Sequence, residues 1–231
     1  MIPHIIHQAW EGRTEPVPFR LKMLANSWIE QNPAWEYRLW SNDEMIDLVE
    51  TRFPYFAETY HNFEFNVQRW DAIRYMILYE YGGIYADLDT ECLKPIDNLL
   101  ADETCCFGEE PVENCKLFNL NRLVGNAIMA SVPGHPVFLR ILDEIQKSLH
   151  NYDKHIVLHT TGPLMITRIT DSLSDDDNVR ILPYEYVSPL RKKDTAVLLT
   201  QGTDSVLKEK LSKAYCVHYF FGSWEDNFSF Y

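Results

Sequence analysis

The sequence predicts an α/β fold in which helices flank a mainly parallel central sheet. Short apolar segments typical of buried strands cover residues 2–10, 35–40 and 84–87. Segments with helical spacing of apolar residues lie between them, at 18–30 and 68–81. Strands that alternate with helices in this way are usually parallel and joined by crossover helices.

The first 45 residues supply two strands, one helix and the start of another. The helix at 18–30 places a set of apolar residues on one face: Leu21, Leu24, Ala25, Trp28 and Ile29. Alternation in 35–40 places Trp35, Tyr37 and Leu39 on one side of the second strand. Ser41 and Glu44 then form a capping box, which predicts that the next helix starts there.

Residues 68–91 form the segment on which the functional argument depends. Its helical half carries one predicted apolar face, made of Trp70, Ile73, Ile77 and Leu78. Gly82-Gly83 ends the helix, and a strand follows at 84–87. The helix rises about 15 Å from Asp71 to Tyr81, and the strand returns about 10 Å in the opposite direction. The start of the helix and the end of the strand therefore lie at the same end of the fold.

This reversal predicts that Asp71 and Arg74 meet Asp87 and Asp89. The two aspartates offer hard oxygen ligands of the kind that Mg²⁺ and Mn²⁺ prefer. An isolated Asp-x-Asp is more often a solvated turn. Here a buried strand aims the pair at the carboxyl edge of the sheet, where open α/β sheets bind their ligands.

In the second half of the chain we expect further strands at 104–108, 122–131, 179–182 and 214–221. Residues 109–121 are expected to form a loop. Helices are expected after His135, over 136–149, and from Pro163 onward, where Thr160-Thr161-Gly162 precedes a proline in its favoured first turn. His135 is interpreted as a cap or packed residue, and the acidic run 175–177 as a solvated loop. The basic triplet 191–193 is interpreted as a solvent-facing turn, and the alternative for this triplet is contact with an anionic acceptor or lipid headgroup.

Composition narrows the class of protein. The chain has 231 residues, enough for one substantial core, so we expect a single domain over 1–231. A formal net charge of -13 argues against nucleic acid as a partner. Five cysteines without C-x-x-C spacing predict reduced thiols rather than a zinc site or a disulfide framework. No signal peptide and no apolar run of about 18 residues is evident, so we expect a cytoplasmic protein, with peripheral association at an inner membrane left open.

The run DAIRYMILYEYGGIYADLD, residues 71–89, resembles the sugar-binding region of the DXD glycosyltransferase family. That family includes fungal initiating mannosyltransferases and bacterial capsular-polysaccharide transferases, and the run is distantly similar to the large glucosylating bacterial toxins. The resemblance extends over residues 2–224 and is securest over 1–100. It implies a GT-A fold, which is Rossmann-like, with a nucleotide-sugar half at about 1–100 and an acceptor or lid half at about 101–231.

The resemblance also implies roles for individual residues. By it, the catalytic set is Asp71, Arg74, Asp87 and Asp89. The nucleotide sugar is bound by Trp10, Asp71, Arg74, Asn126, Ser223 and Trp224. A metal is held by Asp87, Asp89 and His218 of a His-x-x-x-Gly-Ser-Trp ending. The alternatives are that Trp10 and His218 are core residues and that Asn126 is a turn residue.

The activity implied is metal-dependent transfer of a hexose, with retention, using Mn²⁺ or Mg²⁺. A UDP-sugar donor is favoured, with a glycan or lipid-linked saccharide acceptor in bacterial surface or capsule polysaccharide synthesis. A GDP-mannose-dependent mannosyltransferase and a metal-dependent nucleotide-sugar hydrolase are the alternatives, and a non-catalytic sugar-binding module is a third. The absence of a P-loop or G-x-G-x-x-G fingerprint counts against a nucleotide hydrolase or phosphotransferase. The oligomeric state is open.

Overall fold

The computed structural model describes the whole chain except residues 11, 13–14, 150–154 and 223–231. In this part of the chain, six strands form the central sheet in the order β2-β1-β3-β6-β5-β7. The strands are β1 (Ile5–Ala9), β2 (Glu36–Trp40), β3 (Gly83–Ala86), β5 (Cys105–Glu109), β6 (Val124–Ser131) and β7 (Val179–Leu182). Only β6 pairs antiparallel to its neighbours, and the other pairings are parallel. The expected mainly parallel α/β sheet is therefore confirmed.

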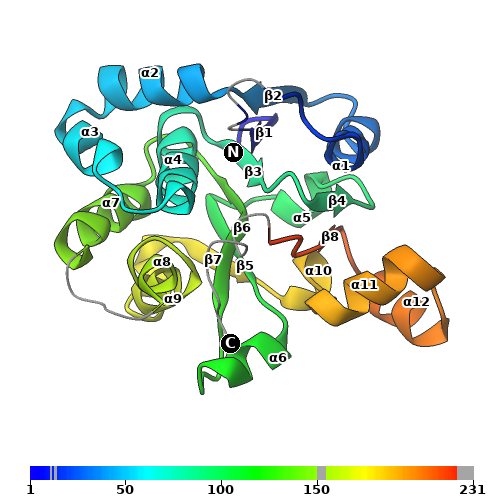
Figure 1. Ribbon diagram of the computed structural model, residues 1–231. Coiled ribbons are helices and arrows are strands. Elements are labelled where there is room, and N and C mark those ends of the chain that lie inside the picture. The colour runs from blue at the N-terminus through cyan, green and yellow to red at the C-terminus, as the bar shows by residue number, and fades with distance from the viewer. Residues whose placement is uncertain (11, 13–14, 150–154, 223–231) are drawn as a thin grey trace.

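Helices cover one face of the sheet, on the left of Figure 1. They are α2 (Asn42–Arg52), α3 (Pro54–His61), α4 (Asn66–Tyr81), α7 (Pro136–Ser148), α8 (Ile156–Thr160) and α9 (Pro163–Asp171). The largest core lies between this layer and the sheet, and Tyr85 of β3 points into it. Because side chains alternate along a strand, the neighbours of Tyr85, Ile84 and Ala86, lie in a second core on the other face.

The second face is covered by a mixed layer, on the right of Figure 1. It contains α1 (Phe19–Gln31), α5 (Asp97–Leu100), α10 (Tyr184–Val187) and a two-stranded antiparallel sheet of β4 (Thr90–Cys92) and β8 (Cys216–His218). Leu207 of α12 (Ser205–Ser212) packs with Leu24 and Val217 beside this layer, and α11 (Lys192–Gln201) precedes it. The β4–β8 sheet matters for function because it extends directly from Asp89.

Several local expectations were wrong. Helix α4 is buried continuously from Asp71 to Leu78, so it has no polar face there, and Trp70 is only half-buried. Its position between the sheet and the other helices of the layer explains this. Ile29 and Leu39 are exposed. On edge strand β2 it is Trp40 that is buried, because it packs against His7 and Tyr81.

The second half also contains more helix than predicted. The expected loop after β5 includes α6 (Val112–Leu117), and the expected basic turn is the start of α11. The last predicted strand shortens to Cys216–His218. The acidic run is an exposed 3₁₀ turn, Asp175–Asp177, and His135 caps α7, as predicted. Five further short helices (α3, α5, α8, α10 and α12) were not predicted.

A two-glycine turn joins α4 to β3 and sets the register of the site. Gly82 and Gly83 have φ of 65° and 88°, a region that glycine adopts readily. A Cβ on Gly83 would lie 2.4 Å from the carbonyl oxygen of Ile5, and one on Gly82 would lie 2.8 Å from that of Ser131. The turn is thus held between β1 and β6, and α4 runs back along the sheet with Asp71 beside the end of β3.

Candidate active site

Asp71, Arg74 and Asp87 meet at the carboxyl edge of the sheet, as the lengths of helix and strand predicted. The Nη2 atom of Arg74 lies 3.1 Å from Oδ1 of Asp71, and its Nη1 lies 3.1 Å from Oδ1 of Asp87. Arg74 is 6% exposed and Asp71 5% exposed. Because little water reaches this position, the guanidinium of Arg74 is the main compensation for the negative charges of both carboxylates.

Asn126 and Thr161 complete the surroundings of Asp71. Because β6 runs antiparallel to β3, the start of β6 lies at the same edge as the end of β3. Asn126 Nδ2 donates to Asp71 Oδ1 at 2.9 Å, and the backbone carbonyl oxygen of Asn126 accepts from Arg74 Nη1 at 2.9 Å. Thr161 Oγ1, just before α9, donates to Asp71 Oδ2 at 2.8 Å. Asn126 thus belongs to the cluster rather than to an isolated turn.

Tyr75 makes two further contacts in the cluster, which were not predicted from the sequence. Tyr75 Oη donates to the carbonyl oxygen of Thr161 at 2.6 Å and accepts from Asn126 Nδ2 at 2.9 Å. The sequence indicated for Thr161 only a place just before the start of a helix. Tyr75 stood inside the recognised motif, but spacing alone does not show that its hydroxyl joins α4 to α9.

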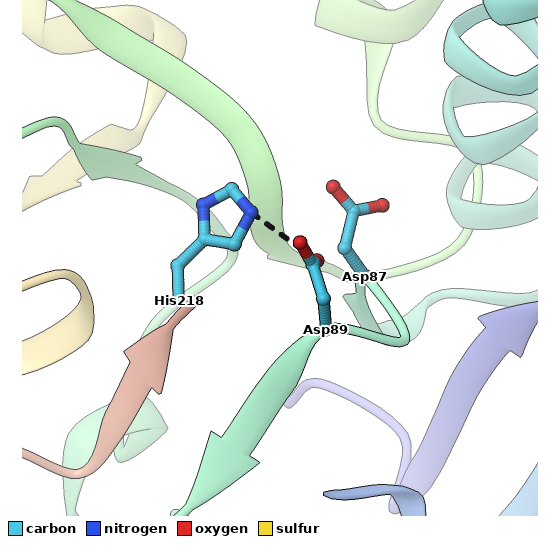
Figure 2. Close-up of side chains that lie close together, drawn as sticks. All are labelled: Asp87, Asp89 and His218. Atoms are coloured by element: carbon cyan, nitrogen blue, oxygen red, sulfur yellow. Dashed lines mark ion pairs between the residues drawn. The ribbon is translucent and has the colours of Figure 1, made fainter. Parts of the chain in front are cut away.

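Asp89 and His218 form the second half of the cluster. Antiparallel pairing of β4 with β8 sets Thr90 opposite His218, which brings the imidazole beside Asp89. His218 Nε2 lies 3.2 Å from Asp89 Oδ1, and Figure 2 shows Asp87 next to the same carboxylate. One ligand atom from each of Asp87, Asp89 and His218 can be chosen so that all lie within 4.8 Å of one another. The backbone N–H of Phe221 also donates to Asp89 Oδ2 at 2.9 Å.

The charges of the cluster are strongly perturbed. Burial raises the pKa of Asp71 to about 6, although Arg74 and Thr161 oppose this. Burial also raises the pKa of Asp87, with Arg74 opposing. For Asp89, the cost of burial is outweighed by His218, so that its pKa is lowered. Burial alone would lower the pKa of His218, but Asp89 and other nearby carboxylates raise it to about 9. These shifts in pKa favour a protonated imidazole of His218 beside an ionised Asp89.

These residues fit a divalent cation. Two carboxylates and one imidazole form a mixed oxygen and nitrogen donor set that Mn²⁺ accepts, and the carboxylates also suit Mg²⁺. His218 must release its Nε2 proton before it can act as a ligand. The positive charge that His218 carries is then replaced by the charge of the cation.

The remaining predicted residues lie apart from this cluster or outside the described part of the chain. Trp10 follows β1 directly at the same sheet edge and is half-buried, with Nε1 donating to the carbonyl oxygen of Glu15 at 2.9 Å. It belongs to none of the hydrophobic clusters of the described residues, which does not favour the core interpretation. Ser223 and Trp224 lie outside the described residues.

Comparison with known proteins places this site in a family. The model of the glycosyltransferase sugar-binding region containing the DXD motif matches residues 18–106. An uncharacterized glycosyltransferase, L373, of Acanthamoeba polyphaga mimivirus is 30% identical over 196 residues, which cover 82% of this chain and 74% of the viral protein. The chain belongs to the DXD glycosyltransferase family. The resemblance inferred from residues 71–89 is therefore confirmed, and the family is one of glycosyltransferases.

Two fungal proteins are also similar to this chain. Mannosyl phosphorylinositol ceramide synthase SUR1 of Saccharomyces cerevisiae is 35% identical over 175 residues, covering 73% of this chain and 42% of the relative. Inositol phosphoceramide mannosyltransferase 2 of Schizosaccharomyces pombe is 33% identical over 201 residues, covering 84% and 53%. This chain spans about half the length of these two relatives.

The fold of this DXD glycosyltransferase matches solved structures. PaToxG glycosyltransferase superposes with a TM-score of 0.58 at 16% identity, covering 93% of this chain and 85% of that one. The GT-A fold expected from the sequence is thereby confirmed. None of the helices among the described residues combines the length and apolar character needed to cross a bilayer.

Proposed function

We propose that this DXD glycosyltransferase transfers mannose from GDP-mannose to a hydroxyl group of an inositol-phosphate lipid. The observation that carries the transferase chemistry is the convergence of the Asp71–Arg74–Asp87 network with the Asp89–His218 pair at one sheet edge. Mannose and the lipid acceptor are supported by the fungal relatives, whose names give that sugar and inositol phosphoceramide. These relatives favour mannosyl transfer over the UDP-sugar and capsule-synthesis interpretation.

Asp71 and Arg74 organise the donor site in this proposal. Three donors already bind the Asp71 carboxylate, from Arg74, Asn126 and Thr161. This leaves acceptor capacity for one sugar or ribose hydroxyl. Arg74 fixes the orientation of Asp87 and offsets the crowded negative charge. Because every contact is made before substrate arrives, the site needs little reorganisation during the reaction.

Asp87, Asp89 and His218 would hold a divalent cation, Mn²⁺ or Mg²⁺. When bound, such a cation acts as a Lewis acid that neutralises negative charge on the departing diphosphate. In the same proposal Trp10 stacks on the base, Asn126 faces the sugar, and Ser223 and Trp224 close over the diphosphate. Trp10 follows the first strand at the sheet edge that carries the aspartates, which supports its role.

The proposed reaction retains configuration by substitution on one face of the sugar. The bond from the anomeric carbon to the diphosphate oxygen breaks, and a bond to the acceptor oxygen forms on the same face. The acceptor proton passes to the departing diphosphate oxygen. A double displacement would need a free carboxylate beneath the ring. Asp71 is bound by three donors and does not fit that role.

The test is a donor and acceptor panel with purified protein. GDP-mannose, UDP-glucose and UDP-galactose are each incubated with Mn²⁺, with and without an inositol-phosphate lipid in detergent. We expect mannosylated lipid and GDP. Asp87→Asn and Asp89→Asn should each lose product at least about 100-fold, as expected for groups that stabilise charge in the transition state, whereas the exposed Asp176→Asn should not.

The same panel separates the other functions. Preferred turnover of a UDP-sugar would refute the choice of mannose, and transfer to soluble glycans alone would refute the lipid acceptor. Release of nucleoside monophosphate would show a nucleotide-sugar hydrolase. Wild-type levels of product in both aspartate variants would refute the assignment of the site.

A further inference from the structure

A buried carboxylate with no assigned role lies next to His218. Glu110 directly follows β5 and is 9% exposed. Its one hydrogen bond from a side chain comes from Asn114 Nδ2, at 3.0 Å to Oε2, as far as the described residues show. Burying a carboxylate costs free energy unless partners compensate for the lost water. The position of Glu110 therefore needs an explanation beyond packing.

A small cavity joins Glu110 to His218 and Ser188. Its volume is about 10 Å³, and Glu110, Ser188 and His218 are among the residues that line it. Within the described part of the chain, Nδ1 of His218 and Oγ of Ser188 are buried and have no hydrogen-bond partner. A cavity of this size with two to four polar neighbours is suited to one ordered water. Such a water would satisfy both orphaned atoms at once.

The orientation of His218 gives this water a purpose. Nε2 faces Asp89, and Figure 2 shows the other ring nitrogen on the side of the ring away from both aspartates. A histidine that binds a metal through one nitrogen almost always donates its other N–H to a carboxylate, a carbonyl or a water. That donor fixes both the tautomer and the angle of the ring.

Gly125 of β6 leaves room for the Glu110 carboxylate. A Cβ added to Gly125 would lie 2.5 Å from Oε1 of Glu110, well inside van der Waals contact. No positive φ is recorded for Gly125, so its backbone does not require glycine. The missing side chain thus has one evident effect, which is to let the carboxylate occupy this place.

We propose that Glu110 and Ser188 are positioning residues that hold His218 through a water in this cavity. His218 Nδ1–H donates to the water, and the water donates to the Glu110 carboxylate. Nε2 is then left with its lone pair directed at the cation site. The inference deepens the proposed function and rests on its metal site.

The test measures Mn²⁺ affinity by calorimetry, without and with saturating GDP, for wild type and Glu110→Gln. We expect the variant to bind Mn²⁺ about 10- to 100-fold more weakly, as for other groups that orient metal ligands. Glu113→Gln is the matched control, because Glu113 is a partly exposed carboxylate on nearby α6. Ser188→Ala should weaken binding by a smaller factor. Nitrogen NMR of the imidazole in the Mg²⁺ form should show a single Nδ1–H tautomer in wild type and a mixture in Glu110→Gln.

Gly125→Ala keeps the experiment decisive if Glu110→Gln does not fold. It leaves every charge in place but displaces the carboxylate, so we expect the same loss of Mn²⁺ affinity. Unchanged affinity in a folded Glu110→Gln or Gly125→Ala protein would overturn the proposal, as would a metal-bound structure with Glu110 as a direct ligand. If wild type itself binds no Mn²⁺, the metal site and this inference both fail. If wild type and the variants bind equally, only the inference fails.

Discussion

Replacing Arg74 with methionine tests how the charged cluster is stabilised. Arg74 compensates both Asp71 and Asp87, and the side chains of Arg74 and Asp71 are each 7% exposed. Removing one partner of a buried ion pair typically costs about 3–5 kcal/mol, because the other charge stays buried without compensation. Methionine has nearly the length of arginine, so little of this cost comes from a cavity.

The assay is urea unfolding in EDTA, so that no cation compensates for the lost charge. We expect a loss of about 4 kcal/mol in the free energy of unfolding. For a chain of this length that corresponds to a fall in Tm of about 10 °C. Saturating Mn²⁺ should return part of the loss, because a cation beside Asp87 replaces some of the missing positive charge.

Arg52→Met is the matched control. Arg52 pairs with Glu80 on the surface and its side chain is 59% exposed, so its removal should cost less than about 1 kcal/mol. If Arg74→Met were no more destabilised than Arg52→Met, the cluster would not depend on this arginine, and the electrostatic argument for the site would be wrong.

Three further predictions concern pH and the glycine turn. Burial lowers the pKa of His7 to about 4, so as the pH falls the unfolded chain is protonated at a higher pH than the folded one. The free energy of unfolding should therefore fall by about 3 kcal/mol between pH 6.5 and 4. Urea titrations of His7→Gln should show a smaller pH dependence. Because the pKa of His218 is about 9, Mn²⁺ must displace a proton, and calorimetry should show affinity rising up to about tenfold per pH unit between pH 7 and 9; a flat profile would contradict His218 as a ligand. Gly83→Ala should lower the free energy of unfolding by at least about 2 kcal/mol, since its Cβ would lie 2.4 Å from the Ile5 carbonyl oxygen. Gly134→Ala, which has a positive φ but no atom within 4 Å of the added Cβ, should lower it by about 1 kcal/mol. Equal losses in thermal melts would show that crowding at Gly83 is unimportant.

The sequence predicted the parts of the site that depend on local geometry. The lengths of α4 and β3 and the turn at Gly82-Gly83 were enough to bring Asp71 and Arg74 to Asp87. The starts of α2, α7 and α9 were also predicted, because a capping box or a proline in the first turn specifies them locally.

Contacts between distant segments were harder to predict. Thr161 reaches Asp71 across 90 residues of chain, and nothing local to either residue specifies their pairing. Glu110 was expected in a loop and lies in one, but its burial beside Ser188 and His218 depends on segments far along the chain and was not predicted. The short helices of the second half, such as α10 with 4 residues, offer too few turns for an apolar period to be recognised.

The route of the chain through the cluster affects when the site can exist. The carboxylate of Asp89 accepts a hydrogen bond from the backbone N–H of Phe221, 132 residues later, and pairs with His218 from the same region. Contacts this distant in sequence form late and slowly during folding. A ribosome-bound chain that has emerged only through β7 would already hold all six strands of the sheet, yet it would lack an imidazole to complete the cation site. We therefore expect tight cation binding to appear only after β8 has been synthesised and has paired with β4, so that bound Mn²⁺ reports assembly of this small sheet.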